Sequence, residues 1–104
     1  MSDIRKTWTD NRITVIGPKQ QVMLFRDSNW TRYLRAQFGE LIESSKRRFV
    51  WEFKTVTPPT EPLRKLSAHW SQLVLLLDYE TQHQRLKSLA KAQAGQLQDY
   101  TISY

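Results

Sequence analysis

Apolar residues recur along this chain with two different periods, and these periods predict strands and helices. In Arg48–Thr55 every second residue from Phe49 to Phe53 is aromatic, which is the pattern of a strand with one buried face. Residues 12–16 are rich in β-branched side chains, and residues 73–80 begin with a run that is apolar on both faces, as in a central strand. The pattern therefore predicts three strands.

Amphipathic stretches between these strands predict two helices. Residues 19–27 follow the dipeptide Gly17-Pro18, whose proline suits the first turn of a helix. Residues 61–70 follow Thr60, an expected N-cap, and the two prolines before it end the preceding strand because proline cannot donate to a ladder. Strands and helices together in a chain of this length indicate a mixed domain, which we expect to be of the α+β class.

Two stretches give conflicting signals. In residues 30–45 the first half has apolar residues at helical spacing, whereas Leu41 and Ile42 suit a short strand. Residues 82–94 are rich in glutamine, leucine, lysine and alanine, which favours a helix. Gly95 and the apolar alternation that follows it favour a hairpin instead. Pattern alone leaves both stretches open.

Length and composition indicate one domain. The chain has 104 residues, of which 1–10 are expected to be a polar leader and 11–104 a single domain. It has no cysteine, which excludes disulfides, thiol catalysis and cysteine-ligated metals. The first residues are polar and charged, and the longest apolar run, residues 73–77, is too short to cross a bilayer. We therefore expect a cytoplasmic protein.

The charge balance adds one functional hypothesis. Lysine and arginine number 16 against 10 aspartates and glutamates, which gives a net charge of +6. A basic protein is attracted to nucleic acid, because neutralised phosphates release counterions. The basic residues are scattered along the chain, and Lys46, Arg47 and Arg48 form the only triple. These three residues are the candidate nucleic-acid contacts.

The strand after this triple places Phe49, Trp51 and Phe53 on one face. Such a face can stack unpaired bases, as in RNA-recognition domains. The opposite face carries two charged residues and is a poor core. Because one face must pack beneath the helices and the aromatic face buries more apolar area, we expect the aromatic residues to form core.

The remaining candidate chemistry is sparse. His69 and His83 are the only histidines, and two imidazoles without a patterned third ligand do not define a metal site. Glu52, Asp78 and Glu80 could meet across the sheet, either as a cation site or as a solvated cluster beside basic residues. No glycine-rich phosphate loop or activated nucleophile accompanies them. No catalytic residue, metal or cofactor is predicted.

Three segments together resemble the YubB-type ferredoxin-like family, a group of small domains of unknown function in phage, plasmid and bacterial genomes. Residues 11–18 look like that family's opening strand and glycine turn. Residues 53–59 are similar to its strand and double-proline segment, and residues 75–80 to its next strand. Gly95 stands where a terminal hairpin of the family turns.

This resemblance implies a ferredoxin-like split βαβ fold, with two helices on one face of an antiparallel sheet and a C-terminal β-hairpin. Residues 86–94 would then pair with residues 97–103 against their local propensity, because tertiary pairing often overrides local preference. The family has no known activity, so the resemblance implies no catalytic residue and no cofactor.

The expected function is therefore a non-enzymatic binding or accessory domain that acts through a protein partner. Nucleic-acid binding is the alternative, and an enzyme is the third class. Residues 97–104 would form an edge strand, and its last five residues carry no side-chain charge and no proline. We expect this edge to form a homodimer or to be covered by the leader through Trp8.

Overall fold

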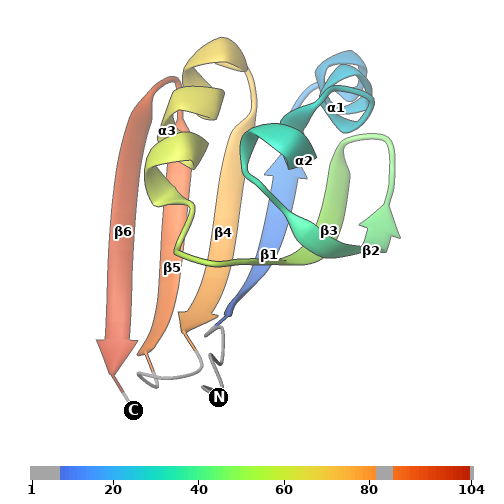
Figure 1. Cartoon of the computed structure of the whole chain (residues 1–104). Helices are drawn as coiled ribbons and strands as arrows, with labels where there is room; N and C mark the ends of the chain where they lie inside the picture. The colour runs from blue at the N-terminus through green and yellow to red at the C-terminus, as the bar shows by residue number, and fades with distance from the viewer. Residues whose placement is uncertain (1–7, 82–85, 104) are drawn as a thin grey trace.

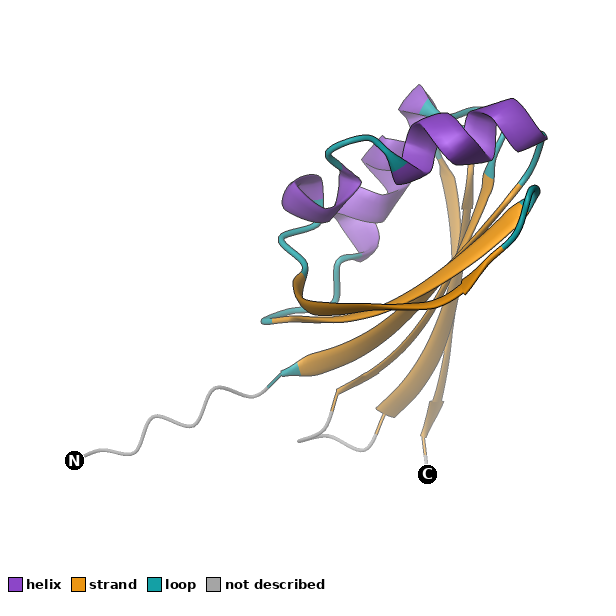
Figure 2. Cartoon of the chain, turned by 90° about the vertical axis from the view of Figure 1, so that its right-hand side faces the viewer, coloured by secondary structure: helices purple, strands orange, loops and turns teal. Residues whose placement is uncertain are grey.

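The computed structural model describes residues 8–81 and 86–103, which form a six-stranded antiparallel sheet with helices on one face (Figure 1). Figure 2 shows the helices gathered on one side of the twisted sheet, while the other face stays open. The strand order is β2-β3-β1-β4-β5-β6, so β2 and β6 are its edges. In chain order the elements are β1 (Thr9–Ile16), α1 (Lys19–Arg26), α2 (Trp30–Tyr33), β2 (Gln37–Ser44), β3 (Arg48–Thr55), α3 (Thr60–His69), β4 (Val74–Thr81), β5 (Leu86–Gln93) and β6 (Gln96–Ser103).

The predicted ferredoxin-like arrangement with two helices is wrong. The described residues form three helices on a sheet of six strands, and strand dominates the structure, although an α+β composition is compatible with it. Part of the difference arises after Tyr33, where α2 ends after a single turn. Arg35 there has a left-handed backbone with φ 57°, which turns the chain out of the helix and into β2.

The C-terminal hairpin is confirmed, and it settles the conflict in residues 86–94. These residues form β5, which pairs with β6 from Leu86 opposite Ser103 to Gln93 opposite Gln96. Ala94 and Gly95 have φ of 49° and 83°, as a two-residue hairpin turn of the favoured hand requires. The alanines that suggested a helix lie instead on the buried face of β5, where their small size lets α3 pack closely.

The other predicted elements are close to those observed. β3 has the predicted bounds, and α1 ends one residue earlier than predicted. α3 begins and ends one residue earlier than predicted, so Thr60 is its first residue and Pro59 is the N-cap. β1 begins at Thr9, within the expected leader, and Trp8 places its ring 5.5 Å from that of Phe38 in β2. None of the described helices is long and apolar enough to cross a membrane.

The core lies between the sheet and the helices and is rich in aromatic rings. Phe49 and Phe53 are almost fully buried there, so the aromatic face of β3 is core and not a stacking platform. Trp30 of α2 stands 5.8 Å from each of these two rings, and Phe25 of α1 stands 5.9 Å from Phe49. These contacts leave the opposite face of the sheet for polar residues.

Candidate functional site

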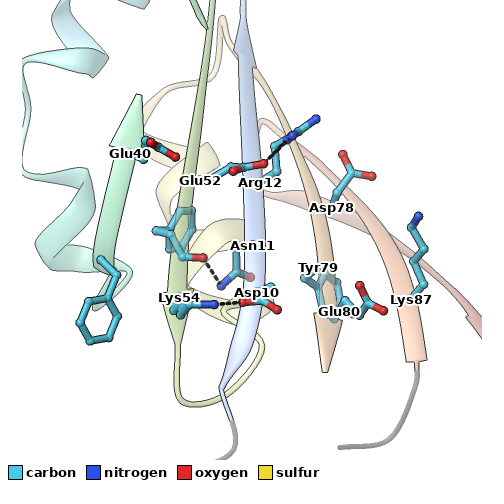
Figure 3. Close-up of a pocket in the computed structure, with 12 residues that line it drawn as sticks. Asp10, Asn11, Arg12, Glu40, Glu52, Lys54, Asp78, Tyr79, Glu80 and Lys87 are labelled. Carbon is cyan, nitrogen blue, oxygen red and sulfur yellow. Dashed lines mark hydrogen bonds and ion pairs between the residues drawn. The ribbon is translucent and has the colours of Figure 1, made fainter. Parts of the chain in front are cut away.

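The open face of the sheet carries a grid of acidic and basic residues around a hollow of about 420 Å³ (Figure 3). Arg12 of β1 lies opposite Glu52 of β3 on one side and Asp78 of β4 on the other. Its Nε donates to Glu52 Oε2 over 2.8 Å. In the next row Lys54 donates to Asp10. Cross-strand pairs of opposite charge stabilise a sheet surface modestly.

This grid overturns the idea that Glu52, Asp78 and Glu80 gather as a cation site. Arg12 stands between Glu52 and Asp78, so the two carboxylates do not share a ligand position. Lys87 of β5 is the register partner of Glu80. Within the described ranges no group of three acidic or histidine residues is placed to hold a metal ion.

The predicted candidate residues, the histidines and the basic triple, are not gathered into one site by the described structure. His69 is exposed at the last residue of α3, and His83 lies outside the described residues. Lys46 and Arg47 are exposed in the turn between β2 and β3, where neither makes an ion pair with a described residue. Arg48 opens β3 with its Nε 3.6 Å from Glu43 Oε2. The first two residues of the triple thus lie in an exposed turn, whereas the third lies in a strand and faces an acidic side chain.

Charge is divided between two regions of the described chain. Among the charged residues of the strands, five are basic and seven acidic, a net of −2. The helices and turns carry eight basic and two acidic residues, a net of +6. The residues of this second region are Lys19, Arg26, Asp27, Arg32, Arg35, Lys46, Arg47, Glu61, Arg64 and Lys65. This division of charge is not visible in the order of the sequence, because the residues of each region come from segments far apart in the chain.

The β2 edge is irregular and partly charged. Its register with β3 shifts between Gln37 and Glu40 and again between Leu41 and Glu43, and all eight of its residues are exposed. The side chain of Trp51 fills the space beside Gly39, where a Cβ would stand 2.4 Å from the indole nitrogen. Bulges and charges on an edge strand hinder pairing with another chain.

The β6 edge is regular and almost uncharged. All eight register pairs with β5 follow without a shift, and the strand contains no basic residue and no proline. Its one acid, Asp99, accepts hydrogen bonds of 2.8 and 2.9 Å from the Tyr79 hydroxyl. On the open face Tyr100 is 58% exposed opposite Leu89, which is 43% exposed. A regular edge with so little charge is the kind of edge to which a further strand can add.

A small polar cluster on the helix-facing side of β5 helps to hold the β6 edge against the sheet. Tyr79 of β4 reaches past β5 to Asp99, and Ser88 Oγ lies 2.9 Å from Thr101 Oγ1. Burial raises the pKa of Tyr79 above its ordinary value, and the hydrogen bond to Asp99 raises it further. Sequence reasoning missed this cluster. The available signal was the alternation of small residues in β5, which leaves room for Tyr79.

No family model matches this chain, and neither the curated proteins nor the solved structures include a match. The resemblance to the YubB-type family therefore stays a prediction.

Proposed function

We propose that this chain is a non-enzymatic binding domain that acts through a protein partner, and that the partner pairs with the β6 edge. The observation that carries the proposal is the contrast between the two edges. β2 is bulged and exposes Glu40 and Glu43, whereas β6 presents a regular, nearly uncharged ladder. Main-chain hydrogen bonds give affinity when a strand is added to such an edge.

A second copy of the chain is the first partner to test. Two β6 strands can pair antiparallel about a twofold axis, which is the commonest symmetry of protein dimers. The alternative of a leader folded along β6 is weakened by the position of Trp8. Its ring contacts Phe38 of β2, at the opposite edge of the sheet.

The acids on the open face support a binding role over catalysis. Glu52 and Asp10 are paired with Arg12 and Lys54, so neither stands free as a general base. The Tyr79 hydroxyl donates to Asp99 and has a raised pKa, so it loses its proton less readily than an ordinary tyrosine. We also place the protein in the cytoplasm, and the absence of cysteine supports a reducing compartment.

Two lysine substitutions test the edge proposal. Tyr100→Lys and Ile42→Lys each replace an exposed apolar residue, on β6 and on β2 respectively. We expect the wild-type chain and Ile42→Lys to dimerise in multi-angle light scattering at high micromolar concentration, and Tyr100→Lys to be monomeric. Dimerisation of Tyr100→Lys to the wild-type extent contradicts self-pairing through β6.

If the wild-type chain is a monomer, the same two variants test a different partner protein. A protein retained by immobilised wild-type chain and by Ile42→Lys, but lost by Tyr100→Lys, supports pairing at β6. Equal retention by both variants overturns the proposal. Circular dichroism of each variant first establishes that the sheet is intact.

Nucleic-acid binding is the second candidate, favoured by the +6 charge of the helices and turns. The experiment is fluorescence anisotropy with single- and double-stranded oligonucleotides at low salt. We expect Lys46→Glu with Arg47→Glu to weaken binding and to reduce its salt dependence. Lys87→Glu with Lys91→Glu, on the sheet, is the matched control. Absence of binding by the wild-type chain at low salt rules this candidate out.

A further inference from the structure

A groove lies on the helical side of the molecule, away from the β6 edge. It runs between the end of α2, the segment that enters β2, the Pro58-Pro59 turn and the start of α3, and its volume is about 670 Å³. Volumes of this order are typical of ligand sites. Segments that are distant in the sequence form the groove, so the pattern of residues along the chain does not predict it.

Part of the lining of the groove is apolar, and the Pro58-Pro59 turn stiffens it. Tyr33 is 44% exposed and Val56 is 55% exposed, although both are large apolar side chains. Pro58 and Pro59 have ring-fixed backbones, and Thr55 Oγ1 donates to the Thr57 carbonyl over 2.7 Å to hold the turn. A site with preformed walls loses little conformational entropy when it binds.

The rim of the groove is positively charged. Arg35 and Lys65 line it, and neither makes an ion pair within the described part of the chain. Glu61 also lines it, but Arg64 Nε donates to its Oε1 over 2.5 Å. This contact lowers the pKa of Glu61. The charge of Lys65 also lowers the pKa of Glu61. Among the lining residues, Arg35 and Lys65 outnumber the single carboxylate of Glu61, so the rim is net positive beside an apolar surface.

Arg35 adds an independent observation. Its φ of 57° lies in the left-handed region, where glycine is the usual residue at the end of a helix. A long charged side chain in such a position is uncommon, and strained residues of this kind cluster at binding sites. Arg35 lines the groove at this point.

We propose that this groove binds an acidic peptide segment of a protein partner, with an apolar side chain of the peptide against Tyr33 and Val56. Carboxylates on either side of that side chain then pair with Arg35 and Lys65. A peptide suits the walls better than a nucleic acid, because successive bases need several exposed ring faces and the groove offers one aromatic residue. This site is separate from β6, so either proposal stands without the other.

The test is fluorescence anisotropy with a labelled peptide of alternating glutamate and leucine. We expect Lys65→Glu and Arg35→Glu each to weaken binding by about tenfold, and Lys91→Glu on the open face of β5 to leave it unchanged. Arg35→Gly also removes the charge and suits the left-handed backbone, so it keeps the fold while weakening binding.

A further variant separates a groove from diffuse charge attraction. Val56→Ser keeps the net charge, and we expect it to weaken peptide binding as well, because it removes an apolar contact. The proposal is overturned if Val56→Ser binds like wild type or if Lys91→Glu weakens binding as much as Lys65→Glu. It is also overturned if a single-stranded oligonucleotide binds more tightly than the peptide and depends on the same residues.

Discussion

The two edges of the sheet, β2 and β6, have the same length and opposite character. Both are eight residues long and pair with a neighbour on one side. β2 has two register shifts and a residue with left-handed backbone, Phe38 at φ 55°. β6 has a continuous register and a nearly uncharged sequence. One sheet thus combines an edge built against pairing with an edge open to it, and the open edge is where we expect function.

The edges also differ in how they are attached. β2 packs through close approach, since Gly39 leaves room for the Trp51 indole. β6 is attached through hydrogen bonds, because the Tyr79 hydroxyl donates to Asp99 from two strands away. This difference predicts that β2 is sensitive to added volume and β6 to lost polar contacts.

The largest expected effect follows from adding volume at β2. Gly39→Ala places a Cβ within 3 Å of three atoms of the rigid Trp51 ring, so we expect a loss of about 1–3 kcal/mol in the free energy of unfolding. Urea denaturation measures it. Gly95→Ala at the β6 turn meets no such contact and should cost about 1 kcal/mol through its φ alone. A larger loss at Gly95 than at Gly39 would contradict the contrast.

Removing a polar contact should matter more at β6. Tyr79→Phe deletes the hydrogen bonds to Asp99 from a buried position, and we expect it to cost about 1–2 kcal/mol. The matched change at the other edge is Ser44→Ala, which deletes the exposed 2.9 Å contact with Arg26. We expect its cost to be below about 0.5 kcal/mol in the same denaturation assay. Equal losses of unfolding free energy in the two variants would show that the two edges do not differ in their dependence on polar contacts.

Alkaline pH should weaken the attachment of β6 selectively. The pKa of Tyr79 is raised above 10.0 in the folded state, so its contribution to stability is complete below the unfolded value and is lost as pH rises through the folded value. We expect the unfolding free energy of wild type to fall more steeply above pH 10 than that of Tyr79→Phe. If the unfolding free energies of the two proteins fall in parallel above pH 10, the titration of Tyr79 does not contribute to stability as expected.

The smallest effect is expected midway between the edges. Glu52→Gln removes the charge that faces Arg12 on the open face, where both side chains are substantially exposed. Such ion pairs are screened, and we expect a loss of about 0.2–1 kcal/mol that vanishes at high salt. Thermal unfolding at low and high salt checks this. A large loss that persists in salt would indicate that the charged grid has a greater role than either edge.

Local pattern was sufficient for several elements of this protein. The alternation of aromatic residues in β3 repeats every two residues, so it marks a strand and its buried face without reference to other segments. The Gly17-Pro18 turn and the amphipathic stretch after it likewise predict α1. Composition also set the net charge and the absence of cysteine. These properties depend on neighbouring residues or on simple counts.

Tertiary structure alone decided the rest, because it depends on which distant segments pack together. Ala90 and Ala92 favour a helix by propensity, yet they lie in β5, which pairs with β4 and β6 and buries both alanines on the side that contacts α3. Strand register set Arg12 between Glu52 and Asp78, which separated carboxylates that the sequence allowed to meet. The regular β6 edge and the groove beside Pro58 each need several elements at once. No local pattern encodes them, since their chemistry arises only where separate segments are brought together by the core.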